Sequence, residues 1–172
     1  KALSNYTGRN TIAYYSAFLT RSVTGTDIND SDMTGFMNAL KGMDCSKGLD
    51  LILHTPGGSP AAAEAIVSYL RSKFHNDIRV IVPQISMSAG TMIACAAKVI
   101  IMGKQSSLGP IDPQFNGIPA YNIKAEFEEA KADLAVHPEN AQYWAIKLQQ
   151  YPAAFMKTAL DAIELSSNLI TV

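Results

Sequence analysis

The sequence is short of cysteine, of charge and of long apolar runs, and each shortage excludes a class of protein. Its two cysteines, Cys45 and Cys95, provide neither a disulfide framework nor the paired spacing of a zinc site. The net charge is −1 with 17% charged residues, which favours neither a nucleic acid nor an anionic membrane as a partner. No stretch approaches the roughly 20 apolar residues that a membrane-spanning helix needs. We expect no metal and no cofactor.

What the sequence does have is enough apolar residues, 48% of 172, to build the core of one globular domain. We expect a single domain over residues 1–172, with a core over about 11–115 and a helical tail over about 119–172. The low charge content hints at surface that is buried in an oligomer. Two unpaired cysteines fit a reducing, cytoplasmic compartment. Because the chain opens at Lys1 without Met, it is a candidate fragment, and any membrane tether or association would belong to the full-length protein.

Residues 50–90 combine two apolar strands with two unusual turns. A strand over 50–55 ends in Pro56-Gly57-Gly58, a helix follows over 59–74 with Ser59 as its cap, and a strand over 78–83 leads to Ser86-Met87-Ser88-Ala89-Gly90. This order predicts a βαβ unit. Ligands in open α/β folds bind beyond the carboxyl ends of the strands, so the two turns are the best candidates for a functional site.

The rest of the chain predicts further strands and then helices. A β-branched and aromatic run favours a first strand, Ser31 is a candidate cap for the next helix, and the region rich in Gly, Pro and Ser after Met102 is long enough to be a working loop. The expected strands are 11–19 and 98–102, the expected helices are 32–41, 89–97, 121–134, 140–150 and 152–170, and the expected loop is 103–117.

The double glycine has two explanations. Gly57 and Gly58 can take positive φ and let the backbone approach a ligand, and their N–H groups could then hold an oxyanion or a phosphate. A tight strand-to-helix turn that needs glycine for geometry alone explains the pair equally well. A nucleotide phosphate loop is excluded, because no Gly-Lys-Ser/Thr follows.

Ser88 also has two explanations. It lies between a strand and a helix and has small neighbours, so its hydroxyl could attack a carbonyl while the Ala89 N–H holds the oxygen. On sequence alone, a helix cap made by Ser88 or Ser86 is the commoner role for such a serine. The presence of both turns at strand ends favours a nucleophile at one turn and oxyanion donors at the other.

A serine nucleophile needs a base, and several residues compete for that role. His54 ends a strand beside the turn, but a buried histidine with satisfied hydrogen bonds is the more frequent finding there. His75 and His137 are expected to be solvated helix ends. Asp112 could orient a base or form a turn with Pro113. A lysine serves if burial lowers its pKa, and spacing does not choose among Lys124, Lys131, Lys147 and Lys157.

Three motifs, Leu51-Ile-Leu-His-Thr-Pro-Gly-Gly58, Met87-Ser-Ala-Gly-Thr91 and Gly109-Pro-Ile-Asp-Pro-Gln114, together resemble the serine dehydrogenase proteinase family. That family is similar to signal peptide peptidase A, to membrane-bound Ser/Lys proteases and, more distantly, to the Clp protease. The resemblance covers roughly residues 14–114. It implies an α/β Clp-protease/crotonase-like fold of repeated ββα units, here with a helical C-terminal part.

The resemblance also implies roles for single residues. Ser88 matches the nucleophile, Gly57 and Gly58 match the oxyanion turn, and Ala89 matches the second donor. The Clp protease has a histidine about where Asp112 falls, so its Ser-His-Asp triad is not matched here. The Ser/Lys relatives place a lysine in a helix well beyond the serine. Lys131 is nearest to that position, and Lys124 is next.

The expected function is therefore a serine endopeptidase of the Ser/Lys dyad type. It would cleave peptides or segments of membrane proteins, use a backbone oxyanion hole and assemble as a homo-oligomer, as members of this superfamily usually do. The missing histidine motivates one alternative, a catalytically inactive scaffold of the same fold that binds a peptide. The other alternative is an acyl-CoA hydrolase or isomerase of the crotonase type, which stabilises an enolate with paired N–H groups and no serine.

Overall fold

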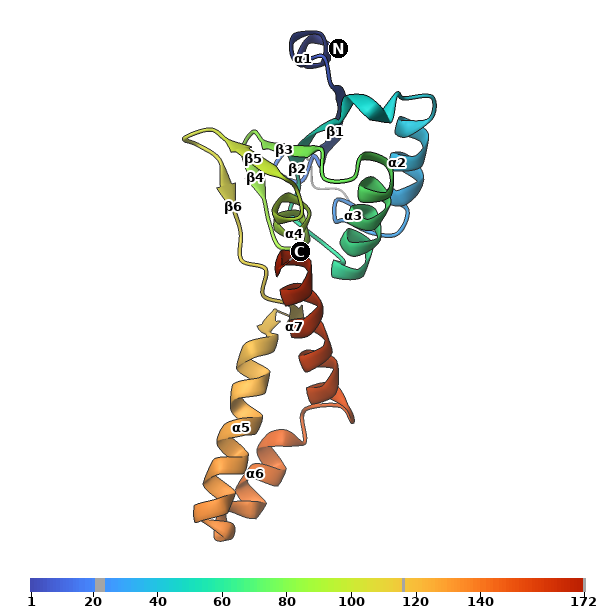
Figure 1. Ribbon diagram of the computed structural model, residues 1–172. Coiled ribbons are helices and arrows are strands. Elements are labelled where there is room, and N and C mark those ends of the chain that lie inside the picture. The colour runs from blue at the N-terminus through green and yellow to red at the C-terminus, as the bar shows by residue number, and fades with distance from the viewer. Residues whose placement is uncertain (21–23, 116, 172) are drawn as a thin grey trace. The chain divides into compact units, whose positions relative to one another are not determined.

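The computed structural model describes residues 1–20, 24–115 and 117–171, which form two compact units (Figure 1). The first unit comprises Lys1–Ile111 together with the C-terminal residues from Leu169, and the second comprises Asp112–Asn168. The division falls inside the expected loop 103–117, shortly before the expected end of the core near residue 115. Whether the two units act as the single domain expected from the sequence stays a prediction.

The first unit is built on a parallel four-stranded sheet. Its strands are β1 (Asn10–Tyr15), β2 (Leu49–His54), β3 (Ile78–Val82) and β5 (Val99–Met102), in the order β1-β2-β3-β5. Side chains of β2 are buried on both faces, which explains why its sequence is almost wholly apolar. The expected α/β class with a parallel sheet is thereby confirmed.

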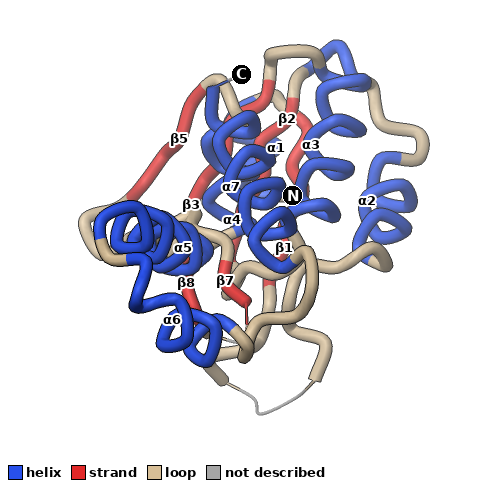
Figure 2. The backbone as a smooth tube through the Cα atoms, turned by 90° about the horizontal axis from the view of Figure 1, so that it is seen from below, coloured by secondary structure: helices blue, strands red, loops and turns tan. Residues whose placement is uncertain are grey.

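Three helices pack against this sheet: α2 (Asp32–Leu40), α3 (Pro60–Phe74) and α4 (Ala89–Cys95). Helices α2 and α3 lie side by side in Figures 1 and 2. The Ser59 hydroxyl accepts the Ala62 N–H at 3.2 Å, so the predicted cap of α3 is confirmed. The buried stripe of α3 consists of Ala62, Ala63, Ile66, Val67, Leu70 and Phe74.

Two sequence-based expectations near the first strand are wrong. The strand ends at Tyr15 rather than Leu19, because the chain turns where the Thr20 N–H donates to the Ala17 carbonyl. Ser31 does not cap α2 with its side chain. The Asp32 carboxylate instead accepts the Asn29 N–H at 2.9 Å and the Tyr14 hydroxyl at 3.0 Å.

The expected loop over 103–117 contains short strands. Strand β6 (Ser107–Leu108) pairs in parallel with β4 (Ile85–Ser86), and β7 (Gln114–Phe115) pairs with β8 (Ile118–Pro119). Strands of two residues carry no periodic signal, so sequence patterns do not reveal them. The sequence analysis also missed three other short elements: the helix α1 (Ala2–Thr7) and the 3-10 helices η1 (Cys45–Lys47) and η2 (Pro138–Asn140).

The second unit is helical, as expected for the C-terminal part. It contains α5 (Ala120–Val136), α6 (Ala141–Leu148) and most of α7 (Phe155–Thr171), and its small core is formed by Ala120, Ile123 and Ala159 with aromatic neighbours. The Asp133 carboxylate joins α5 to α6, because it accepts the Trp144 indole N–H at 2.6 Å and the Asn140 amide at 2.9 Å.

An ion cluster closes the amino-terminal end of the sheet. Asp50 is fully buried in β2 and accepts charged hydrogen bonds of 2.8 Å from Arg9 and Arg79, which flank it on either side. Burial opposes ionisation of Asp50, but the hydrogen bonds from both arginines outweigh it, and its pKa lies below the usual value. The cluster ties the chain before β1 to β2 and β3 at this end.

Candidate active site

The two turns predicted to form a site are in contact: Pro56-Gly57-Gly58, the double-glycine turn, and Ser86-Met87-Ser88-Ala89-Gly90, the serine turn. Gly57 has φ +102°, and a Cβ added to it would lie 2.8 Å from the Ser88 Cβ and 2.7 Å from the Met87 carbonyl oxygen. Real Cβ atoms do not approach other atoms so closely, so only glycine fits at this contact. The double-glycine turn and the serine turn therefore face each other at the carboxyl ends of their strands.

Main-chain hydrogen bonds hold the turns together. Thr55 and Ser86 form a parallel bridge in which the Thr55 N–H donates to the Ile85 carbonyl and the Met87 N–H donates to the Thr55 carbonyl, both at 3.1 Å. This bridge extends the pairing of β2 toward β4. It fixes the spacing between Gly57 and Ser88 by backbone atoms alone.

Ser88 has an unusual backbone conformation, with φ +48° and ψ −118°. A non-glycine residue in such a region costs about 1–3 kcal/mol, and strain of this kind clusters at functional sites. A sharp strand-to-helix turn of this type lifts a nucleophilic serine out of the backbone surface. Ser88 is partly exposed, and its hydroxyl makes no hydrogen bond to any residue in the described part of the chain.

The helix-cap explanation does not account for either serine. Ser88 precedes α4, yet its side chain makes no cap hydrogen bond. The Ser86 hydroxyl is fully buried and has no partner among the described residues. The hydroxyl of Ser88 is thus available at the surface, whereas that of Ser86 lies beneath the turn.

Backbone donors at the site fall into two groups. The Gly57 N–H donates to the Thr55 hydroxyl oxygen at 3.1 Å, so this expected oxyanion donor is occupied. The main chain of Ile28 bonds to the residues on either side of Gly58. The Ile28 N–H donates to the Gly57 carbonyl at 2.7 Å, and the Ile28 carbonyl accepts the Ser59 N–H at 2.8 Å. The N–H groups of Gly58 and Ala89 have no hydrogen-bond acceptor among the described residues.

The serine turn is held by hydrogen bonds of Thr91 and by close contacts at Gly90 and Gly109. The Thr91 hydroxyl donates to the Ser86 carbonyl at 2.8 Å and accepts the Gly109 N–H at 3.1 Å. A Cβ on Gly90 would lie 2.4 Å from the Thr55 methyl, and one on Gly109 would lie 2.2 Å from the Met87 sulfur. Sequence reasoning quoted Thr55, Thr91 and Gly109 within motifs but gave them no role, because the contacts of Thr55 with the serine turn and of Thr91 with Gly109 join distant parts of the chain.

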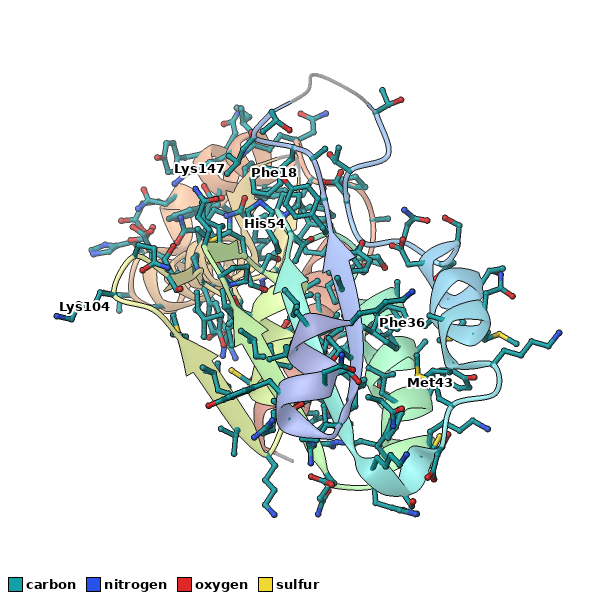
Figure 3. All side chains as sticks on the ribbon, turned by 90° about the horizontal axis from the view of Figure 1, so that it is seen from above. Phe18, Phe36, Met43, His54, Lys104 and Lys147 are labelled. Carbon is teal, nitrogen blue, oxygen red and sulfur yellow. The ribbon has the colours of Figure 1, made fainter. Side chains whose placement is uncertain are left out.

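His54 lies beside the site but is enclosed by aromatic rings. It is 2% exposed, and its ring stacks between Tyr15 and Phe18, with centroid distances of 4.9 Å and 5.2 Å. Figure 3 shows the Phe18 and His54 rings close together. The expectation of a buried histidine is confirmed, but the expectation of satisfied hydrogen bonds is wrong, because Nδ1 has no partner in the described structure. His75 and His137 are exposed, as expected.

The other base candidates belong to the second unit. Lys124, Lys131 and Lys157 are exposed there. Lys147 pairs with Glu126 at 3.1 Å and lies over the Trp144 ring at 4.7 Å. The hydrogen bond that Lys147 donates to the Glu126 carboxylate raises the pKa of Lys147, which is opposite to the change that a lysine base needs. Asp112 is partly buried, and its Oδ1 accepts no hydrogen bond from the residues described.

No group of three or more His, Cys, Asp or Glu side chains in the described ranges could hold a metal ion. No helix within them combines the length and the apolar character needed to cross a membrane.

A parallel sheet with two facing turns at its carboxyl end, followed by helices, is the arrangement of ClpP-like α/β proteins. The chain belongs to the family of ClpP-like SDH-type serine proteinases, whose sequence pattern matches residues 12–138. This match confirms the resemblance to serine dehydrogenase proteinases, and it reaches beyond the three motifs into α5.

Two archaeal proteins are similar in sequence. The uncharacterized protein MJ0137 of Methanocaldococcus jannaschii is 42% identical over 108 residues, which are 63% of this chain and 37% of that protein. The uncharacterized protein MJ1495 of the same organism is 45% identical over 75 residues, which are 44% of this chain and 25% of that protein. The chain thus spans well under half the length of both relatives.

Proposed function

We propose that this chain is a serine peptidase in which Ser88 is the nucleophile. The observation that carries the proposal is the strained Ser88 backbone, which holds the Ser88 Cβ against the Gly57 turn while the Ser88 hydroxyl makes no hydrogen bond within the described residues. Membership in a serine proteinase family supports the same reaction class. A serine that merely capped α4 would have neither the positive φ nor the free hydroxyl.

The reaction begins with attack of the Ser88 Oγ on the scissile carbonyl carbon, and its proton passes to a base. The carbonyl oxygen becomes an oxyanion, for which the N–H groups of Gly58 and Ala89 are the proposed donors, since neither donates to an acceptor in the part of the chain that the structure describes. Gly57 contributes by letting the turn approach Ser88. The base then gives the proton to the leaving amine as the C–N bond breaks, which leaves the acyl group as an ester on Ser88. A water molecule that loses its proton to the same base attacks this ester, the C–Oγ bond breaks, and the base returns the proton to Ser88 Oγ. Each oxyanion donor is worth about 10²–10³ in rate.

Lys131 is the proposed base, with Lys124 next. Neither forms an ion pair with another described residue, whereas Lys147 is engaged by Glu126. An exposed ammonium must lose its hydration to act as a base at neutral pH. We therefore include in the proposal that Lys131 becomes buried when the chain assembles as a homo-oligomer.

The substrate class proposed is a peptide, or an extended segment of a membrane protein. This chain matches only parts of its longer relatives, so an additional domain in the full-length protein, including a membrane tether, is compatible with the proposal. Without such a tether the peptidase would act in the cytoplasm.

A fluorophosphonate probe tests the nucleophile. The Ser88 oxygen should displace fluoride from phosphorus and form a stable adduct, and Ser88→Ala should abolish labelling. Ser68→Ala is the matched control, since Ser68 is an exposed serine of α3, and it should label like the wild type. Labelling that persists in Ser88→Ala, or labelling absent from the wild type in every oligomeric state, contradicts the proposal.

A catalytically inactive peptide-binding scaffold is the second candidate. The observation that favours it is the absence of any hydrogen-bonding base at Ser88 among the described residues. It would bind peptides without any labelling of Ser88. The crotonase-type alternative rests on the paired N–H groups alone, and acyl-CoA turnover that survives Ser88→Ala would point to it.

A further inference from the structure

Thr55 is the residue at which the two turns are joined. It is fully buried, and its main chain bonds to residues on both sides of Ser86, through the Ile85 carbonyl and the Met87 N–H. Its side chain reaches the other turn, because Oγ1 accepts the Gly57 N–H at 3.1 Å. Both the serine turn and the double-glycine turn therefore depend on this one residue.

The hydroxyl and the methyl group of Thr55 have separate contacts. Oγ1 bonds Gly57, whereas Cγ2 lies against Gly90 at the start of α4, where a Cβ would come within 2.4 Å. Valine would keep the methyl contact and the shape but lose the acceptor. Serine would keep the acceptor but lose the methyl group. The two functions of the side chain can thus be removed one at a time.

Two hydrogen bonds, one at the N–H and one at the carbonyl of Gly57, decide which N–H of the turn is left free. Glycine peptides rotate easily, so Gly57 and Gly58 have no intrinsic preference for one orientation. Thr55 Oγ1 fixes the Gly57 N–H, and the Ile28 N–H fixes the Gly57 carbonyl at 2.7 Å. With both groups of Gly57 held, the Gly58 N–H is the donor of this turn that has no acceptor among the residues described.

We propose that Thr55 is a positioning residue for the hydrolysis: its hydroxyl holds the Gly57 N–H and so supports the bond from Ile28 to the Gly57 carbonyl, which lies in the same peptide unit as the Gly58 N–H. The two bonds together keep the Gly58 N–H free and oriented for the oxyanion. The inference rests on the proposed function of Ser88. Thr55 touches neither the substrate nor the reacting atoms, and it acts through the double-glycine turn. Loss of the hydroxyl leaves the nucleophile in place but releases the turn that stabilises the negative charge.

The test compares Thr55→Val with Thr55→Ser and the wild type. Fluorophosphonate labelling is followed over a range of probe concentrations, which separates the maximum rate of inactivation from probe binding. Thr55→Val should lower the maximum rate about 10- to 100-fold with little change in probe binding, because one oxyanion donor is misplaced rather than removed. Thr55→Ser should stay within about threefold of the wild type, because it retains the acceptor.

Amide hydrogen exchange at Gly57 gives a readout that does not depend on catalysis. The Gly57 N–H should exchange faster in Thr55→Val and be protected as in the wild type in Thr55→Ser. Thermal unfolding of each variant shows whether a loss of labelling comes from a loss of folded protein. A purely structural role would lower the unfolding temperature without this selective change at Gly57.

Three results overturn the inference: Thr55→Val labels at the wild-type rate, Thr55→Ser falls as far as Thr55→Val, or exchange at Gly57 is unchanged in Thr55→Val. Failure of the proposed function looks different, because the wild type itself is then not labelled. In that case exchange at Gly57 still decides whether the Thr55 hydroxyl holds the turn.

Discussion

The two ends of strand β2 differ in whether their buried polar groups have hydrogen-bond partners. At the amino-terminal end, Asp50 is fully buried and paired with two arginines. At the other end, buried His54 Nδ1 and Ser86 Oγ have no partner among the described residues, and Ser88 is held in a strained conformation. A satisfied ion cluster contributes order, whereas unpaired groups and strain persist where chemistry requires them. The comparison therefore assigns stability to one end and function to the other.

The strongest test of the comparison is Asp50→Ala. Removing the carboxylate leaves two arginines without their shared partner, and we expect a loss of about 3–5 kcal/mol in the free energy of unfolding. Denaturant unfolding measures it. Ser88 labelling per folded molecule should not change, because the cluster lies at the opposite end of the strand. Lys47→Ala is the control, since its exposed pair with Asp44 should change stability by less than about 0.5 kcal/mol. A drop in labelling of the folded Asp50→Ala protein would break the division between the two ends.

Gly57→Ala probes the functional end. Its new Cβ would collide with Met87 and Ser88 at a positive φ, and we expect a loss of about 2–4 kcal/mol and of Ser88 labelling. Gly35→Ala is the matched control in α2, because its Cβ meets nothing within 4 Å, and it should gain about 0.5–1 kcal/mol. Equal labelling of Gly57→Ala and the wild type would show that the close contact of the turns is dispensable.

The decrease in the free energy of unfolding at acid pH should depend on Asp50. Its pKa is lower in the folded protein than in the unfolded chain, so its contribution is complete above an unfolded pKa near 4 and is lost as pH falls through the folded value. Unfolding measured between about pH 6 and pH 2 should show a shallower acid dependence in Asp50→Asn. An unchanged pH dependence would mean that other carboxylates carry the acid sensitivity.

The smallest effect is expected from Lys147→Ala. The ion pair with Glu126 is partly exposed, so its loss should cost no more than about 1 kcal/mol, and Ser88 labelling should be unaffected. Lys131→Ala is the counterpart that should slow labelling if Lys131 is the base. The reverse pattern, with labelling lost in Lys147→Ala alone, would assign the base to Lys147 instead.

Local patterns were enough to predict the elements that hold the site. The apolar run of β2, the glycine pair and the small residues around Ser88 each leave a short-range signature, and the structure brings the two turns into contact as predicted. The same patterns did not show which peptide N–H would remain free. That depends on Ile28, which is distant in the chain and reaches Gly57 only in the folded protein, and on the Thr55 hydroxyl, for which a sequence pattern gives no orientation.

The base was harder to predict for a different reason. Helical periodicity predicted α5 and α6 with small errors at their ends, but it says only which residues share a helix face. The pairing of Lys147 with Glu126, which argues against Lys147, joins two helices and has no local signal. Short strands such as β4 and β6 escaped prediction in the same way, since each exists only through its partner.

Ile28 has a consequence for how this chain can vary. It supports the double-glycine bend with main-chain atoms alone, while its side chain is only 1% exposed in the core. The requirement at this position is therefore for a peptide unit at a given depth, which any well-packed aliphatic side chain could provide. Substitution at this position should therefore be limited by side-chain volume rather than by chemical identity, although the main chain of Ile28 holds the double-glycine turn.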